Sequence, residues 1–414
     1  MREDKTSVFI CIFAWDTFKW ICKPRSNYFE AFVICQLTDF PLKGCDILDK
    51  KYMHRALELA SKGIGRTNPN PLVGAVIVKD DKVIAEGYHE FFGGPHAEIN
   101  ALRNATESVK GATMYVTLEP CSHYGKTPPC VDAIIESGIK EVVVAMTDPN
   151  PLVAGRGIRN LENNEIAVWS GLLEDEAKEI NEVFIKYITK KTPYVVMKTA
   201  MTLDGKIACK TGESKWISNE KSREYVHILR SRLTGIMVGI GTVLKDDPSL
   251  TCRIGEGLRQ PRRIIVDSTL KIPLESKVLR DEYAGDTIIA TAEGADALKA
   301  ERIKSSGAKV IYLPSKDGRV DLNKLMESLG EEQIDSILLE GGGELNYSAL
   351  KAGIVDKVVT FIAPKILGGK DAPTPVEGEG SCSMSERIEL GKIKVSSFDD
   401  DVMIEGEVKR CLQD

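Results

Sequence analysis

The sequence predicts an α/β fold built from two consecutive layered units. Short apolar runs typical of buried strands alternate with amphipathic helical segments from residue 49 onwards. A chain of 414 residues also exceeds the size of one ordinary hydrophobic core, so two or three domains are expected. A charged amphipathic segment over residues 172–186 separates the two runs and is predicted to be one connecting helix.

The elements of the first unit follow from local patterns. Apolar residues at helical spacing predict a helix over 52–62 that stops before Gly63. Asp80 and Asp81 predict a hairpin turn between strands over 72–78 and 83–88. The remaining elements expected here are a helix over 96–102, strands over 113–118 and 141–146, a loop entering a helix over 128–137, and a short helix and strand within 155–169.

The second unit repeats this alternation. A helix is predicted over 218–233, and strands are predicted over 194–200, 235–238, 263–266, 287–291, 309–313 and 336–339. Glycine-rich turns follow two of these strands, at 239–242 and 340–344, and the second turn leads into a helix. Such turns let backbone amides approach a phosphate, although one turn alone is a weak signal.

The amino-acid composition argues against nucleic-acid and membrane partners and against a disulfide-stabilised protein. The hydrophobic fraction of 43% and the charged fraction of 28% are those of a globular protein. A net charge of -6 provides no basic footprint, so no nucleic-acid partner is expected. No apolar run approaches the ~20 residues of a membrane span, so no membrane partner is expected either. Ten cysteines in a chain of this length do not form a disulfide framework, and a thiolate metal site favours a cytoplasmic location.

An N-terminal extension and two domains are predicted. Residues 1–48 form an N-terminal extension that is expected to be poorly ordered, with a packed N-terminal arm as the alternative. Residues 49–190 and 191–414 are the two α/β domains.

One cluster in the first domain carries chemistry. A histidine and two thiolates, from His96, Cys121 and Cys130, can hold one zinc ion and leave its fourth position for water. Glu98 is then placed to move protons. This pattern is typical of a zinc nucleobase deaminase, although the usual second cysteine follows the first by three residues, and here residues 122–129 intervene. The alternative is a closed zinc module with His123 as a fourth ligand.

The first domain resembles a known family. The segments 67–74 (TNPNPLVG), 96–98 (HAE) and 119–130 (EPCSHYGKTPPC) resemble the bifunctional riboflavin-biosynthesis deaminase/reductase family. The resemblance implies a cytidine-deaminase-like three-layer α/β/α domain followed by a dihydrofolate-reductase-like α/β domain. It also implies that the first domain deaminates 2,5-diamino-6-ribosylamino-4(3H)-pyrimidinone 5′-phosphate. The implied substrate contacts are Asn70, His89, His123 and Lys126, of which the two histidines are expected to donate hydrogen bonds.

The second domain resembles the reductase half of that family through segments 196–205, 239–250 and 339–345. The resemblance implies that NADPH reduces the ribosyl group of 5-amino-6-(5-phosphoribosylamino)uracil to a ribityl chain. The implied cofactor contacts are Ala200, Trp216, Thr242, Asp246, Gly342, Gly343, Glu344, Leu345, Asn346, Tyr347 and Ser348. The implied substrate contacts are Ser214, Arg230, Leu250, Arg253 and Glu340.

Several points remain open from the sequence. Trp216 can stack on a flat ring or lie in the core. Lys198 is a candidate to polarise the substrate, and Asp246 a candidate for proton transfer. The expected partners are small phosphorylated pyrimidines and further copies of the same chain. Two rival functions are a deaminase of another base or of RNA with an appended reductase-like domain, and a zinc-stabilised binding module.

Overall fold

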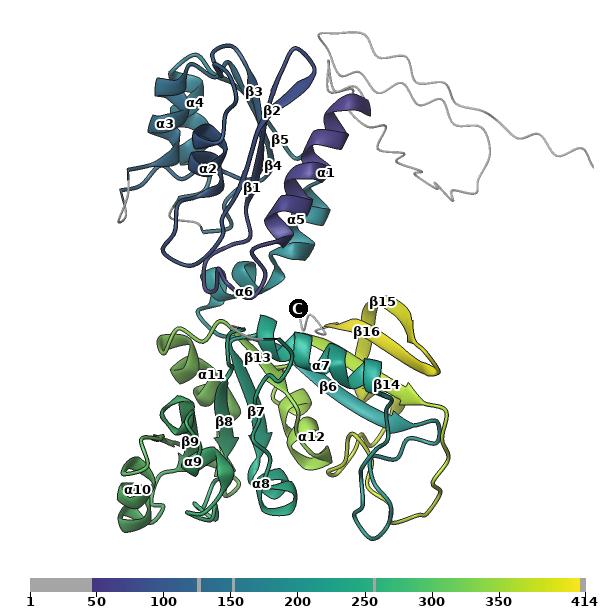
Figure 1. Ribbon diagram of the computed structural model, residues 1–414. Coiled ribbons are helices and arrows are strands. Elements are labelled where there is room, and N and C mark those ends of the chain that lie inside the picture. The colour runs from purple at the N-terminus through teal and green to yellow at the C-terminus, as the bar shows by residue number, and fades with distance from the viewer. Residues whose placement is uncertain (1–46, 125–127, 151–152, 256–257, 410–414) are drawn as a thin grey trace, which may run out of the picture. The chain divides into compact units, whose positions relative to one another are not determined.

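The computed structural model describes residues 47–124, 128–150, 153–255 and 258–409, and Figure 1 shows their elements. Residues 1–46 of the predicted N-terminal extension lie outside this part of the chain. None of the described helices is long and apolar enough to cross a membrane.

The first domain contains a five-stranded sheet in the order β2-β1-β3-β4-β5. Its strands are β1 (Gly74–Lys79), β2 (Lys82–Tyr88), β3 (Thr113–Leu118), β4 (Glu141–Met146) and β5 (Ala167–Ser170). Its helices are α1 (Ile47–Ser61), α2 (Ala97–Arg103), α3 (Cys130–Ser137), α4 (Arg156–Asn163), α5 (Glu174–Ile180) and α6 (Glu182–Lys190). The β2-β1-β3 part is antiparallel and the β3-β4-β5 part is parallel.

Helices cover both faces of this sheet. In Figure 1, α1 and α5 lie on one face and α2, α3 and α4 lie on the other, which confirms the predicted three-layer arrangement. The predicted turn at Asp80 and Asp81 is present, with φ angles of 48° and 59°. Two positive φ angles in succession match the right-handed twist of a hairpin. Gly87 lets α2 pack closely on β2, because a Cβ there would lie 2.2 Å from the backbone nitrogen of Ala101.

The prediction of one helix over 172–186 is wrong. The structure has α5 and α6 instead, and they meet at Asn181, whose backbone leaves helical geometry (φ -109°, ψ 15°). The buried Asn181 amide accepts a hydrogen bond from the backbone nitrogen of Leu72 (2.8 Å) and donates to the oxygen of Leu72 (3.0 Å). This contact lies at a site remote in the sequence, so helical periodicity could not reveal it.

The second domain contains a nine-stranded sheet in the order β10-β9-β8-β7-β13-β6-β14-β16-β15. Its strands are β6 (Tyr194–Thr202), β7 (Gly235–Gly239), β8 (Arg262–Val266), β9 (Thr287–Ala292), β10 (Lys309–Leu313), β13 (Ser336–Leu339), β14 (Lys357–Ala363), β15 (Glu389–Phe398) and β16 (Asp401–Lys409). Two short strands, β11 (Ser315–Lys316) and β12 (Arg319–Val320), form a separate ribbon.

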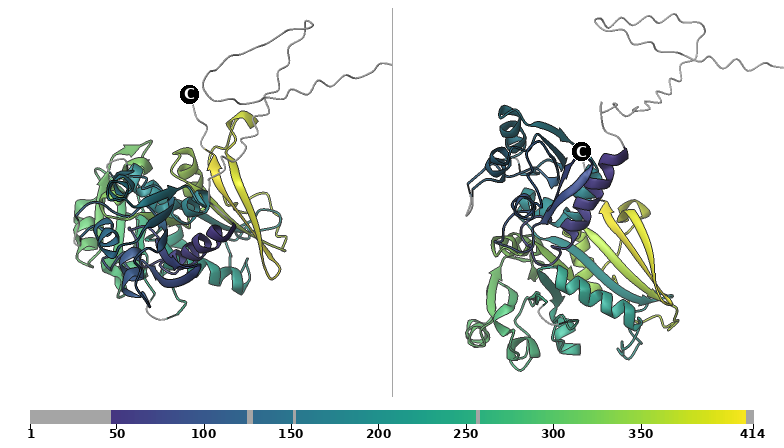
Figure 2. Two further views of the ribbon diagram at one scale, coloured as in Figure 1. Left: turned by 90° about the horizontal axis from the view of Figure 1, so that it is seen from above. Right: turned by 45° about the horizontal axis from the view of Figure 1, so that its top comes forward.

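The helices of this domain are α7 (Glu220–Arg232), α8 (Ile240–Asp246), α9 (Lys277–Arg280), α10 (Ala297–Lys304), α11 (Leu322–Glu331) and α12 (Gly343–Lys351), with 3₁₀ turns at Ala284–Asp286 and Met384–Glu386. The strands from β10 to β14 run parallel, whereas β16 is antiparallel to both of its neighbours, β14 and β15. The long yellow β15–β16 hairpin therefore closes one edge of the sheet (Figure 2). Ligands of open parallel sheets bind beyond the carboxyl ends of the strands, which directs attention to the ends of β6, β7, β8 and β13.

Candidate active sites

The predicted zinc ligands come together in the first domain. His96 is the N-cap of α2, Cys121 follows β3, and Cys130 is the first residue of α3. His96 Nδ1 lies 3.2 Å from Cys130 Sγ and 3.4 Å from Cys121 Sγ, and the three ligand atoms all lie within 4.8 Å of one another. A zinc ion with bonds of about 2.1 Å to nitrogen and about 2.3 Å to sulfur fits among atoms at these separations.

The protonation of the two thiols also suits a cation. Hydrogen bonds with the Cys130 thiol and with His96 together lower the pKa of Cys121 to about 4. The hydrogen bond with Cys121 and burial raise the pKa of Cys130. Cys121 is therefore a thiolate that shares the proton of its neighbour. A metal ion replaces such a proton when it binds.

Glu98 lies on the first turn of α2 and is 3% exposed. Burial, and to a smaller extent the negative charge of Cys121, raise its pKa to about 7. A carboxyl group with a pKa near neutrality can both accept and donate a proton, as general acid–base catalysis requires.

Asn70 and His89 lie beside this cluster and are hydrogen-bonded to each other. The Asn70 Nδ2 atom is 3.2 Å from His89 Nε2, and His89 Nδ1 is 3.0 Å from the oxygen of Pro95. Because a carbonyl only accepts, His89 Nδ1 carries the proton and Nε2 accepts from the Asn70 amide. Both ring nitrogens of His89 are thus paired with protein groups in this structure. The arrangement leaves Asn70 Oδ1 as the atom for a ligand.

The loop that separates the two cysteines is only partly described. His123 is exposed, and Lys126 lies outside the described residues. Glu119 is a residue that sequence reasoning missed. Its buried carboxylate accepts hydrogen bonds from the backbone nitrogens of Gly155 (2.9 Å) and Gly157 (2.8 Å) and so anchors the start of α4 beside the turn that carries Cys121. The sequence feature that could have indicated this role is the position of Glu119 directly before Pro120-Cys121.

The second domain has a cavity of about 860 Å³ at the carboxyl ends of its central strands. Predicted cofactor and substrate residues that line it are Lys198, Ala200, Ser214, Trp216, Arg230, Thr242, Asp246, Arg253, Glu340, Gly342, Gly343, Glu344, Leu345, Asn346 and Ser348. Two predicted contacts do not line it. Leu250 is 3% exposed within a hydrophobic cluster, and the Tyr347 hydroxyl instead donates to the oxygen of Gly380 at 3.3 Å.

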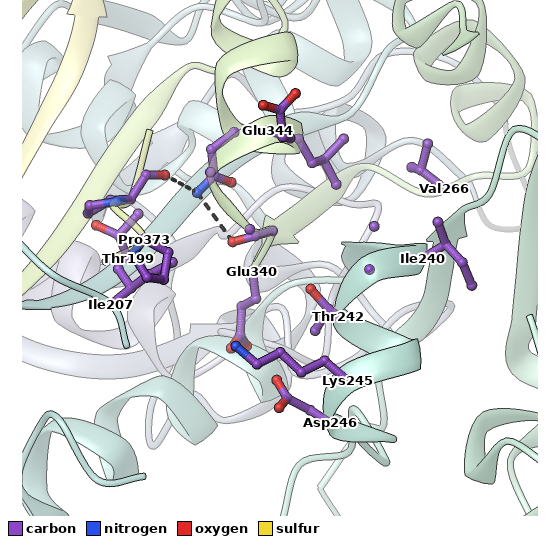
Figure 3. Close-up of a pocket in the computed structure, with 18 of the residues that line it drawn as sticks. Thr199, Ile207, Ile240, Thr242, Lys245, Asp246, Val266, Glu340, Glu344 and Pro373 are labelled. Carbon is purple, nitrogen blue, oxygen red and sulfur yellow. Dashed lines mark hydrogen bonds between the residues drawn. The ribbon is translucent and has the colours of Figure 1, made fainter. Parts of the chain in front are cut away.

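One wall of the cavity is the start of a helix. The helix α12 begins after Gly342 and has no side-chain N-cap among the described residues, so its first N–H groups can bind a ligand. Asn346 donates through Nδ2 to the oxygens of Gly341 (3.3 Å) and Pro375 (2.8 Å), while its buried Oδ1 has no partner among the described residues. Figure 3 shows Thr242 and Asp246 on α8, opposite the helix that carries Glu344. This cavity size, with donors for phosphates, suits a dinucleotide.

A compact charge cluster lies at the floor of the cavity. Arg230 on α7 makes two contacts with the Glu340 carboxylate, and Lys198 Nζ lies 3.8 Å from the same group. Burial alone would raise the pKa of Glu340, but the charges of Arg230 and Lys198 lower it to about 2. Burial lowers the pKa of Lys198, and Glu340 opposes that shift.

Trp216 does not lie in the core, because it is 64% exposed and the Arg223 guanidinium stacks 4.5 Å from its ring centroid. Other residues that line the cavity were not predicted: His227, Lys245, Asp267, Ser268, Lys271 and Arg319. Asp267 and Ser268 directly follow β8, so the rule that ligands lie beyond strand ends could have found them.

Comparisons with known protein families find one match in each of the two domains. Residues 47–146 match the family model described as the cytidine and deoxycytidylate deaminase zinc-binding region. Residues 193–404 match the model described as the RibD C-terminal domain.

Full-length relatives extend the match over both domains. The riboflavin biosynthesis proteins RibD of Actinobacillus pleuropneumoniae and Aquifex aeolicus are each 48% identical over 86% of this chain, and the alignments cover 94% and 98% of those proteins. The structure is similar to that of Acinetobacter baumannii RibD, with a TM-score of 0.79 and 36% identity over 88% of this chain and 99% of that one.

A second similar solved structure is that of an enzyme described as both a deaminase and a reductase. It is the diaminohydroxyphosphoribosylaminopyrimidine deaminase/5-amino-6-(5-phosphoribosylamino)uracil reductase of Thermotoga maritima, with a TM-score of 0.76 and 41% identity over 87% of this chain and 99% of that one. The chain therefore belongs to the RibD family of bifunctional riboflavin biosynthesis proteins, and it joins a zinc-dependent deaminase to an NADPH-dependent reductase.

Proposed function

We propose that the first domain hydrolyses the 2-amino group of 2,5-diamino-6-ribosylamino-4(3H)-pyrimidinone 5′-phosphate and that the second reduces the ribosyl group of the product to a ribityl chain. The observation that carries the first step is the buried Glu98 beside three ligand atoms that lie within 4.8 Å of one another. The reductase cavity in the same chain supports the second step.

In the deaminase, His96, Cys121 and Cys130 hold the metal and Glu98 moves the protons. Zinc, when bound, lowers the pKa of water enough for attack on the ring carbon at neutral pH. Glu98 takes a proton from the attacking water and passes it to the departing amine, so water is consumed and ammonia is released. Asn70 Oδ1 accepts a hydrogen bond from the pyrimidine edge. His123 and Lys126 are proposed to hold the substrate phosphate.

In the reductase, the start of α12 together with Ala200, Trp216, Thr242 and Asp246 binds the cofactor. NADPH supplies the hydride that reduces the opened sugar. Lys198, held beside Glu340, donates a hydrogen bond to a sugar oxygen and polarises it. Arg253 is proposed to bind the phosphate, because the Arg230 guanidinium is already paired with Glu340.

Four broader proposals accompany this function. The deaminase domain spans residues 49–190 and the reductase domain residues 191–414, which is supported by the strands of each sheet falling within these ranges. The chain acts on small phosphorylated pyrimidines without a nucleic-acid or membrane partner. It works in the cytoplasm, where thiolate ligands stay reduced. It forms a homo-oligomer, whose mass light scattering would measure.

The variant Glu98→Gln tests the deaminase assignment. It preserves the side-chain shape but cannot shuttle protons, so ammonia release should fall by ~10²–10⁴-fold. Zinc content and NADPH oxidation with the deaminated intermediate should stay at the wild-type level. Glu58→Gln, an exposed residue of α1, is the matched control. Unchanged ammonia release would refute the mechanism and would favour the zinc-stabilised binding module.

A further inference from the structure

His227 lines the reductase cavity and has no part in the mechanism above. It lies on α7, one turn before Arg230, and is half-buried. Beside it runs the segment that contains Cys252 and Arg253, so the histidine lies where α7 faces this segment.

His227 makes two contacts with this segment, and the one at Nδ1 determines which ring nitrogen carries the proton. The backbone nitrogen of Arg253 donates to His227 Nδ1 at 3.3 Å, and the Cys252 thiol donates to the backbone oxygen of His227 at 3.4 Å. A neutral imidazole that accepts at Nδ1 carries its hydrogen on Nε2. Among the described residues, Nε2 has no hydrogen-bond partner, so this N–H is available to a ligand in the cavity.

The surroundings of His227 keep the ring neutral in the free enzyme. Burial and the positive charges of Arg230 and Arg253 together lower the pKa of His227 to about 4, and Glu340 opposes the shift. At neutral pH the His227 ring is therefore a neutral hydrogen-bond donor, and it adds no positive charge to those of Lys198, Arg230 and Arg253.

Arg230 and Lys198, the cations at the floor of the cavity, already interact with other protein groups. Arg230 uses Nε and Nη2 for Glu340 and Nη1 for the backbone oxygen of Thr251, at 2.7, 3.0 and 3.0 Å. Lys198 lies 3.8 Å from Glu340. Arg253 also lines the cavity, and no carboxylate in the described part of the chain pairs with its guanidinium. A phosphate bound here therefore meets Arg253 and, next to it, the N–H of His227.

We propose that His227 is a further substrate-binding residue of the reductase, which donates its Nε2 hydrogen to the sugar phosphate of the substrate beside the Arg253 guanidinium. This proposal rests on the proposed function, since it takes the reductase substrate to be a sugar phosphate. It assigns the histidine to the binding of the phosphate and not to the transfer of hydride.

The test compares His227→Phe, His227→Gln and wild-type full-length chain, with His54→Phe on the exposed face of α1 as the matched control. NADPH oxidation is measured with the deaminated intermediate, and ribose 5-phosphate and ribose are used as competitors. A hydrogen bond to a charged group is worth a factor of ~10 or more. His227→Phe should therefore raise the KM for the intermediate and the inhibition constant of ribose 5-phosphate by about tenfold or more, with kcat, the KM for NADPH and inhibition by ribose unchanged.

His227→Gln should recover most of the loss, because its amide can supply an N–H near the position of Nε2. An unchanged inhibition constant for ribose 5-phosphate in His227→Phe would overturn the proposal, and so would an equal loss for ribose. If the wild-type chain does not oxidise NADPH, the proposed function fails instead. Calorimetric titration of each variant with ribose 5-phosphate then still decides whether His227 binds the phosphate.

Discussion

The Arg230 guanidinium meets the Glu340 carboxylate through two contacts, Nε to Oε1 at 2.7 Å and Nη2 to Oε2 at 3.0 Å. The two residues belong to elements far apart in the sequence, α7 and the turn after β13. Lys198 on β6 lies beside the same carboxylate. The Glu340 carboxylate thus pairs with both Arg230 and Lys198 at the floor of the reductase cavity. Without it, neither positive charge would have this negative partner.

We expect Glu340→Gln to lower the free energy of unfolding by about 3 kcal/mol at neutral pH, because it breaks a buried ion pair and leaves charges behind. The pKa of Glu340 is lowered from 4.5 to about 2, so its contribution to stability is complete above pH 4.5 and is lost as the pH falls towards 2. Urea unfolding of both proteins between pH 7 and pH 3 measures this. A difference between them that did not shrink below pH 4.5 would contradict the assignment.

Cys130→Ser should weaken zinc binding by more than ~10–100-fold. That range is typical for loss of a residue that only hydrogen-bonds to a metal ligand, whereas this substitution removes a ligand itself. Deamination should fall with zinc content, while NADPH oxidation with the deaminated intermediate should persist. Competition with a chelator measures the affinity. Cys209→Ser, at a half-buried cysteine of the other domain, is the control. Equal zinc affinity in both variants would exclude Cys130 as a ligand.

His89→Phe should raise the KM of the deaminase by a factor of ~5–10, because one hydrogen bond of about 1 kcal/mol no longer orients the Asn70 amide. In the wild-type protein the ring centroids of His89 and His96 lie 5.6 Å apart in an edge-on arrangement, and a Phe ring at position 89 preserves this packing. Zinc content should therefore stay at the wild-type level. Steady-state kinetics of ammonia release, with metal analysis of the same samples, separates the two effects. A loss of zinc in this variant would show that His89 supports the metal site instead.

The sequence predicted what depends on local pattern. The strands over 113–118 and 141–146 were predicted to the residue, because each is a short, largely apolar run in the interior of a sheet. The grouping of His96, Cys121 and Cys130 was also predicted, since the residue types that bind zinc are few.

Features that depend on distant contacts were missed. The break at Asn181 follows from its hydrogen bonds with Leu72, which lies 109 residues away. The place of His227 in the cavity depends on the segment of Arg253, which only the folded chain brings beside α7. The pairing of His89 Nε2 with Asn70 likewise depends on a neighbour that the fold brings close. In each case the missing information was the identity of the neighbour, which periodicity does not contain.

Arg263 on β8 should be the most sensitive ion-pair residue outside the sites. It is 1% exposed, donates to Asp281 at 2.6 and 2.8 Å, and also donates to the backbone oxygens of Val278 and Ser249. Arg263→Ala should therefore cost about 3 kcal/mol or more, since it leaves these acceptors without a donor and opens a cavity. Lys324→Ala removes an exposed pair with Glu327 and should cost far less than Arg263→Ala, because solvent screens the exposed pair. Urea unfolding compares the two variants, and equal losses would mean that burial does not set the strength of the Arg263 contacts.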